Sequence, residues 1–161
     1  MKILFIGDVV NEDAGQALAK FLPKFLKQEN IDISIANGEN SANGNGISPR
    51  SAELIFSSGA DVITGGNHSL RRDEMAEYYS KAAETNYGSH PKKTLIPANL
   101  RSEYSKGYVI IEKHGVKIGI VNLLGTVFMN PCDNPFDAAD RIITEMSEKG
   151  VKNIFVDFHA E

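Results

Sequence analysis

The sequence has very little cysteine, and it lacks long apolar runs. Cys132 is the single cysteine among the 161 residues, so an intrachain disulfide is excluded and nothing argues for an oxidising compartment. No apolar stretch reaches membrane-spanning length, and Met1 leads into a short strand-like run without the features of a signal peptide. These absences predict a cytoplasmic protein with no membrane partner.

Basic charge is also scarce. The 17 Lys and Arg residues are scattered and outnumbered by 21 Asp and Glu, so the formal charge is −4 and duplex nucleic acid is not an expected partner. A small phosphate ester stays compatible, because a bound metal can supply local positive charge. The P-loop pattern and a strand-linked GxGxxG are missing, which argues against a Rossmann-like nucleotide binder. The segment Asn43–Gly46 is interpreted as a flexible rim.

The composition, 42% hydrophobic and 24% charged, predicts one globular α/β domain over residues 1–161. A strand buried on both faces is expected at Lys2–Ile6, and further buried strands are expected at Ile31–Ala36 and Asp61–Thr64. Helices between them predict parallel pairing. The first helix has apolar residues at helical spacing, and Pro23 is predicted to kink it or to begin a second helix. The second helix is predicted to begin at Ser48-Pro49 and to stop at Gly59.

The second half is predicted to begin with a polar helix over 73–84 and a loop over 86–100. An antiparallel hairpin is expected from Tyr108–Glu112 and Lys117–Leu123. A helix over Phe136–Lys149 then precedes a last strand, Asn153–Phe158, which ends at His159.

Polar side chains follow four of the predicted buried strands: Asp8, Glu39-Asn40, Asn67-His68 and His159. Each alone has an ordinary alternative as a helix cap or a turn residue. Because ligands of open α/β folds gather at the carboxyl edge of the sheet, we expect Asp8, Glu39, Asn40, Asn67 and His159 to converge there. Their oxygen and imidazole donors suit iron, manganese or zinc. A two-metal site with Glu39 as a bridge would hydrolyse phosphoesters.

These motifs match a known family. Gly7-Asp8-Val9-Val10, Asn37-Gly38-Glu39-Asn40, Gly66-Asn67-His68 and Asp157–Glu161 resemble the YmdB-like branch of the calcineurin-like metallophosphoesterases, and the resemblance covers nearly the whole chain. It implies two β-sheets flanked by helices and a site with two divalent or trivalent metal ions, usually iron. It also implies a small-molecule phosphodiester substrate, a cyclic nucleotide such as 2′,3′-cyclic AMP.

The resemblance also implies roles for individual residues. Asp8 and Asn40 would bind one ion, Glu39 would bridge, and Asn67 and His159 would bind the other. His68 would donate a proton to the departing ribose oxygen, a task for which imidazolium is chemically suited. His90 and His114 lie in predicted loops and are expected to be solvated.

The sequence departs from the family at two places. The family continues with a Gly-Thr-His-Thr-His segment that carries two more histidine ligands, so this chain is expected to be a truncated domain that binds metal weakly by itself. After His68, Ser69-Leu70-Arg71 replaces an expected Trp and Asp, and Arg71 or Arg72 is expected either to contact phosphate or to face solvent. Base preference stays open.

Two functions of different classes follow. The first is a dinuclear cyclic-nucleotide phosphodiesterase. The second is a catalytically weak or inactive regulatory or scaffold protein that keeps the fold and part of the metal site. A homo-oligomer is compatible with either.

Overall fold

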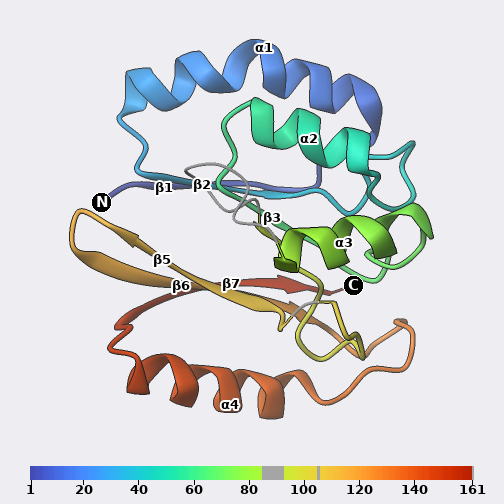
Figure 1. Ribbon diagram of the computed structural model, residues 1–161, viewed down its shortest axis with the longest axis vertical. Helices are drawn as coiled ribbons and strands as arrows, with labels where there is room; N and C mark the ends of the chain where they lie inside the picture. The colour runs from blue at the N-terminus through green and yellow to red at the C-terminus, as the bar shows by residue number, and fades with distance from the viewer. Residues whose placement is uncertain (85–92, 105, 161) are drawn as a thin grey trace. The chain divides into compact units, whose positions relative to one another are not determined.

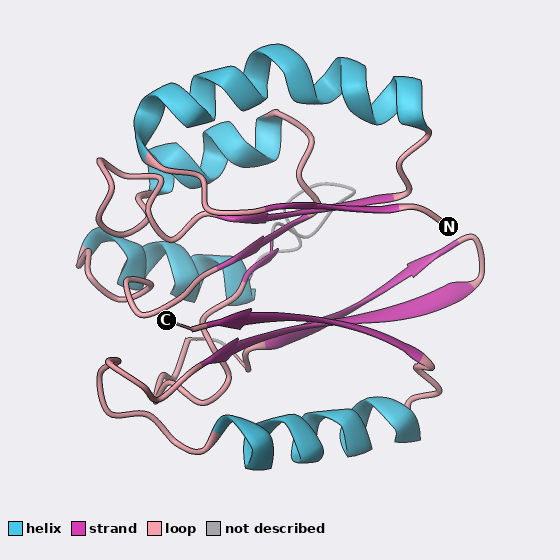
Figure 2. Ribbon diagram, turned by 180° about the vertical axis from the view of Figure 1, so that it is seen from behind, coloured by secondary structure: helices cyan, strands magenta, loops and turns pink. Residues whose placement is uncertain are grey.

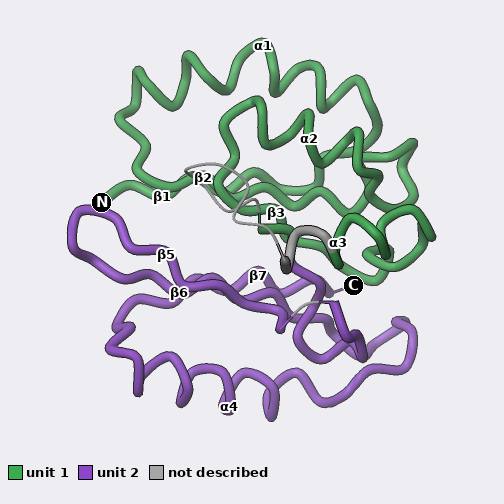
Figure 3. Tube along the Cα trace, in the orientation of Figure 1, with its two compact units in different colours: residues 1–94 green, residues 95–161 purple. Residues whose placement is uncertain are grey.

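The computed structural model describes residues 1–84, 93–104 and 106–160. These divide into two compact units, residues 1–94 and 95–161 (Figure 3). Each unit has its own β-sheet, so the predicted α/β class with two sheets is confirmed. Within the described ranges, no helix has both the length and the apolar character needed to cross a bilayer.

Unit 1 contains a four-stranded parallel sheet with the order β1-β2-β3-β4. Its strands are β1 (Ile3–Ile6), β2 (Ile33–Asn37), β3 (Val62–Thr64) and β4 (Lys93–Thr94). Its helices are α1 (Asn11–Glu29), α2 (Pro49–Ser57) and α3 (Glu74–Glu84). Helices α1 and α2 lie together on one face of the sheet (Figure 1). The predicted parallel pairing of the first three strands is confirmed.

Burial differs between the central and edge strands of this sheet. Every residue of β2 and of β3 is buried, as the sequence predicts. Strand β1 instead alternates between exposed and half-buried residues, with Ile3 and Phe5 exposed. The expectation that this strand is buried on both faces is therefore wrong, because the face that carries Ile3 and Phe5 is exposed, while the face that carries Leu4 and Ile6 is half-buried.

Helix α1 continues through Pro23, so the prediction of a second helix beginning there is wrong. A proline inside a helix leaves the carbonyl four residues earlier, here that of Ala19, without its usual helical N–H partner. Both Pro23 and Ala19 are exposed, so water can satisfy this carbonyl and the helix need not break. Helix α2 begins as predicted: Ser48 caps the backbone N–H of Ser51 and forms a capping box with it.

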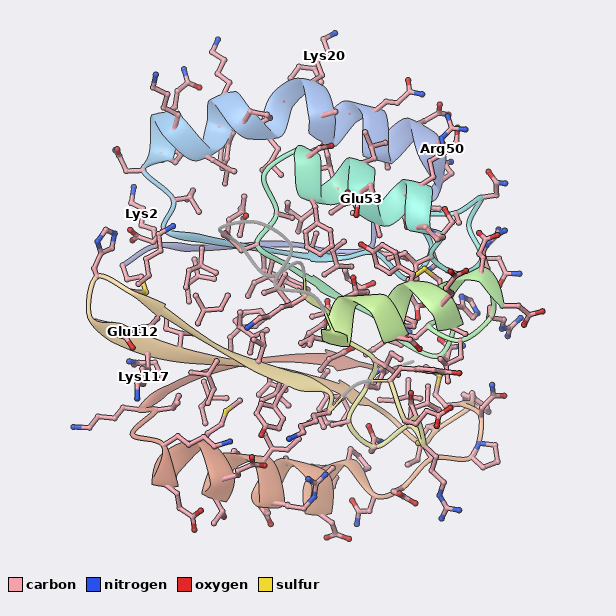
Figure 4. The ribbon with its side chains drawn as sticks, viewed as in Figure 1. Lys2, Lys20, Arg50, Glu53, Glu112 and Lys117 are labelled. Atoms are coloured by element: carbon pink, nitrogen blue, oxygen red, sulfur yellow. The ribbon has the colours of Figure 1, made fainter. Side chains whose placement is uncertain are left out.

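Unit 2 contains the predicted antiparallel hairpin, joined by a third strand parallel to β6. Its elements are β5 (Tyr108–Lys113), β6 (Val116–Leu124), α4 (Pro135–Glu148) and β7 (Asn153–His159), with the sheet order β5-β6-β7. Figure 2 shows α4 running along one face of these strands. Glu112 and Lys117 are register partners in the hairpin (Figure 4). Helix α4 packs on β6 through a core that includes Val121, Ile142 and Met146.

The segment predicted as a loop over 86–100 is only partly described. Residues 85–92, which include His90, lie outside the described residues. Lys93 and Thr94 form the short edge strand β4, which the sequence analysis did not predict.

Candidate functional site

Backbone hydrogen bonds join the loops that follow β1, β2 and β3. The Val9 N–H donates to the Asn37 carbonyl at 2.9 Å, and the Asn11 N–H donates to the Asn40 carbonyl at 3.0 Å. The Gly38 N–H donates to the Thr64 carbonyl at 2.9 Å. Because parallel strands end at the same edge of a sheet, these bonds hold the residues that follow the strands beside one another. The backbone thus brings Asp8 close to Glu39 and Asn40.

Asn40 is the centre of a side-chain network at this edge. Its Nδ2 donates to Asp8 Oδ2 at 2.9 Å and to Glu39 Oε1 at 3.3 Å. Its Oδ1 lies 2.7 Å from Nδ1 of His68. The backbone N–H of His68 donates to Glu39 Oε2 at 3.2 Å. Four of the predicted site residues, supplied by three strand ends, are therefore directly linked within unit 1.

Burial within the network is uneven. Glu39 is only 2% exposed, while the His68 side chain is 23% exposed and Asp8 is exposed. A buried carboxylate needs hydrogen-bond donors or a positive charge to offset its lost hydration. Here it accepts from Asn40 and from the His68 backbone, and its Oε1 lies 3.7 Å from the His68 ring nitrogen Nδ1. The network is therefore anchored on its buried side and accessible at Asp8.

Asn67 and His68 lie in the turn after β3, and both are half-buried. Asn67 follows Gly66 as the motif predicts, one residue before the histidine of the network. Its place in a turn matches the ordinary alternative that the sequence left open, and its role as a metal ligand stays a prediction.

His159 ends β7, where it is the register partner of Leu124. This strand belongs to the three-stranded sheet of unit 2, not to the sheet of β1, β2 and β3. The expectation of one shared sheet edge is therefore wrong for His159, because the β5–β6 hairpin starts a second sheet that β7 joins. Its role as a metal ligand stays a prediction.

The unit 1 network fits a cation through its oxygen donors. Among the described residues, no group of three or more His, Cys, Asp and Glu side chains is placed to hold a metal ion, so the candidate set depends on asparagine as well as carboxylate. Asp8 and Glu39 both direct an oxygen at one polar N–H group, the Asn40 amide. That convergence is what a shared cation requires. Asn40 can add its own oxygen only if its amide turns over, since Oδ1 faces His68.

Arg71 and Arg72, which were expected either to contact phosphate or to face solvent, lie in different environments. Arg72 donates from Nη2 to the Ala42 carbonyl at 2.7 Å and from Nε to the Asn45 carbonyl at 3.1 Å. Its guanidinium therefore holds the loop interpreted as a flexible rim, a structural role that the sequence analysis missed. Arg71 is exposed, and His114 is exposed in the hairpin turn, as expected.

Comparison with known proteins gives the family. The family model described as YmdB-like protein matches residues 4–161. The 2′,3′-cyclic-nucleotide 2′-phosphodiesterase of Bacillus subtilis is 33% identical over 162 residues, covering 100% of this chain and 58% of that protein. A hypothetical protein from Thermus thermophilus matches with a TM-score of 0.82 and 34% identity, over 100% of this chain and 58% of that one.

A novel phosphatase from Mycoplasma pneumoniae matches with a TM-score of 0.79 and 27% identity, over 100% of this chain and 56% of that one. The chain thus spans a little more than half the length of the relatives it matches. The fold is that of the calcineurin-like phosphoesterases, as the motifs indicate. The match to the family model over nearly all of the sequence shows that the chain belongs to the YmdB-like family.

Proposed function

We propose that the protein is a metal-dependent phosphodiesterase that hydrolyses cyclic nucleotides of the 2′,3′-cyclic AMP type. The observation that supports this most directly is the network in which Asp8, Glu39, Asn40 and His68 meet at the ends of three parallel strands. Two relatives, a 2′,3′-cyclic-nucleotide 2′-phosphodiesterase and a phosphatase, are named for phosphoester chemistry, which supports this proposal.

In this proposal the site is dinuclear. Asp8 and Asn40 would hold one ion, Glu39 would be shared, and Asn67 and His159 would hold the second. Iron is the proposed metal, with manganese and zinc as alternatives of suitable ligand preference. When bound, the metal ions supply a water of lowered pKa and positive charge for the phosphate oxygens.

His68 is the proposed proton donor. Its Nδ1 faces Asn40 at 2.7 Å, so Nε2 is the ring nitrogen on the opposite side of the imidazole. Attack by a water oxygen forms a new P–O bond and releases one water proton to solvent, while one P–O(ribose) bond breaks. The ribose oxygen leaves with the bonding electron pair and takes a proton from Nε2 of His68. General acid catalysis of this kind contributes about 10² to 10⁴ in rate.

The decisive variant is Glu39→Gln, with Glu112→Gln on the exposed hairpin as its matched control. Both are prepared in the 161-residue chain, and each is assayed with 2′,3′-cyclic AMP and for bound iron, manganese and zinc. We expect Glu39→Gln to lose both metal and turnover, and Glu112→Gln to keep both. Unchanged turnover in Glu39→Gln would refute the proposal. A wild-type protein that binds metal without turnover would instead support the scaffold alternative.

A further inference from the structure

One buried hydroxyl group closes the turn that follows β3. Ser69 Oγ accepts a hydrogen bond from the Gly66 N–H at 3.0 Å and donates one to the Gly66 carbonyl at 2.8 Å. The Ser69 N–H lies 3.2 Å from the same carbonyl. Ser69 is 1% exposed, so water cannot readily replace these contacts. One side chain thus satisfies both backbone polar groups of Gly66.

The two residues enclosed by this closure are Asn67 and His68. The N–H of His68 reaches Glu39 Oε2 at 3.2 Å, and its ring Nδ1 reaches Asn40 Oδ1 at 2.7 Å. Both contacts depend on the backbone conformation at His68, because the N–H and the side chain belong to that one residue. A turn that opens at Gly66 would therefore disturb both contacts together.

The same turn is also tied to α3. The Tyr79 hydroxyl donates to the Ser69 carbonyl at 3.3 Å, and Tyr79 is 2% exposed. Burial raises the pKa of Tyr79, and the nearby Tyr78 raises it further. The phenol therefore keeps the proton that it donates. The Ser69 carbonyl is therefore bound by Tyr79 of α3, while the Ser69 hydroxyl binds the backbone of Gly66.

We propose that Ser69 is a positioning residue that fixes the 66–69 turn, so that His68 faces Glu39 and Asn40. The sequence suggested only that the stretch 69–71 changes substrate contacts. The structure distinguishes its members, because Ser69 is buried while Leu70 and Arg71 are exposed. The consequence for catalysis rests on the proposed function, whereas the consequence for the turn does not.

The test compares Ser69→Ala with Ser69→Thr, which keeps the hydroxyl. Ser58→Ala is the matched control, since Ser58 is also 1% exposed and its Oγ donates to the Leu54 carbonyl at 2.7 Å. Amide hydrogen exchange at His68 is measured by NMR, together with thermal unfolding. We expect Ser69→Ala to speed exchange at His68 by about tenfold beyond the change in Ser58→Ala, because a local opening is favoured. Ser69→Thr should restore the protection.

Turnover of 2′,3′-cyclic AMP provides the second measurement. We expect Ser69→Ala to lower kcat with little change in KM, because the hydroxyl orients an acid and touches no substrate. If Ser69→Ala does not fold, Tyr79→Phe replaces it, since that change removes only the hydroxyl that reaches the turn.

The inference would be overturned if the His68 amide exchanged at the wild-type rate in the variant examined. It would also be overturned if exchange at His68 rose equally in Ser58→Ala. If the wild type has no turnover, the proposed function is refuted. If Ser69→Ala still loses exchange protection at His68 in that case, the role of Ser69 in the turn is supported.

Discussion

At the residue scale, Gly38 shows how tightly the site is built into the sheet. A Cβ on Gly38 would lie 2.8 Å from Ile63 Cγ2 and 3.2 Å from Ile55 Cδ1. We therefore expect Gly38→Ala to destabilise the fold by about 1 to 3 kcal/mol, because extra volume in a packed core forces its neighbours to move. Gly7→Ala is the control, since its Cβ would meet nothing within 4 Å. Denaturant unfolding of the two variants measures the difference, and equal stability would contradict the packing argument.

His68 allows a second prediction at this scale. His68→Ala should lower turnover by about 10² to 10⁴ while most bound metal remains, because the imidazole serves as an acid and not as a ligand. His114→Ala, in the exposed hairpin turn, should change neither quantity. Parallel kinetics and elemental analysis separate the two effects. Complete metal loss in His68→Ala would make it a ligand instead, and unchanged turnover would remove it from the mechanism.

At the element scale, a polar cluster joins α4 and the residue after it to β5. Glu145 accepts from Tyr108 and from Lys149, whose Nζ lies 2.6 Å away. The Lys149 hydrogen bond and then that of Tyr108 hold the pKa of Glu145 below its ordinary value. A carboxyl with a lowered folded-state pKa stabilises above its unfolded value, and that contribution is lost as the pH falls through the folded value.

The corresponding variant is Glu145→Gln. Its thermal unfolding temperature should fall less steeply than that of wild type as the pH is lowered below about 4.3, the ordinary Glu value. The effect should be small, because the Glu145 and Lys149 side chains are 34% and 49% exposed and solvent screens the pair. Glu148→Gln in the same helix is the control. Parallel unfolding curves for wild type and Glu145→Gln would show that the cluster adds no pH dependence.

Comparison of individual elements shows what sequence can predict here. The strand ends at Asp8, Glu39 and His68 were predictable because Gly and polar residues directly follow short apolar runs. The sequence did not predict that α1 continues through Pro23, because this depends on which side of the helix is exposed to solvent. The exposed face of β1 was not predictable, and neither was the place of His159 in a second sheet. Both depend on how the strands are ordered in space, and no short segment of the sequence specifies that order. The closure of the turn by Ser69 left no pattern that distinguishes it from a surface serine.

At the scale of the whole molecule, the remaining question is whether both units supply metal ligands. Unit 1 holds Asp8, Glu39, Asn40 and Asn67, while His159 belongs to unit 2. A metal bound only by the folded state raises stability, by about 2.7 kcal/mol at a hundredfold excess over Kd. Comparing the thermal shift on adding Mn²⁺ between wild type and single variants therefore shows which of these residues contribute.

We expect Mn²⁺ to raise the unfolding temperature of wild type, and Asp8→Asn to abolish most of this rise, because Asp8 supplies a charged ligand from unit 1. His159→Ala should reduce the rise if the proposed dinuclear site draws on unit 2, since loss of an imidazole weakens the hold on a transition metal. His114→Ala is the control within the same unit, as its removal takes away an equivalent side chain from an exposed turn. Titration with Mn²⁺ at constant protein concentration keeps the comparison free of changes in oligomeric state. Equal metal-induced shifts in wild type and His159→Ala would exclude His159 as a ligand and confine the metal site of this chain to the strand ends of unit 1.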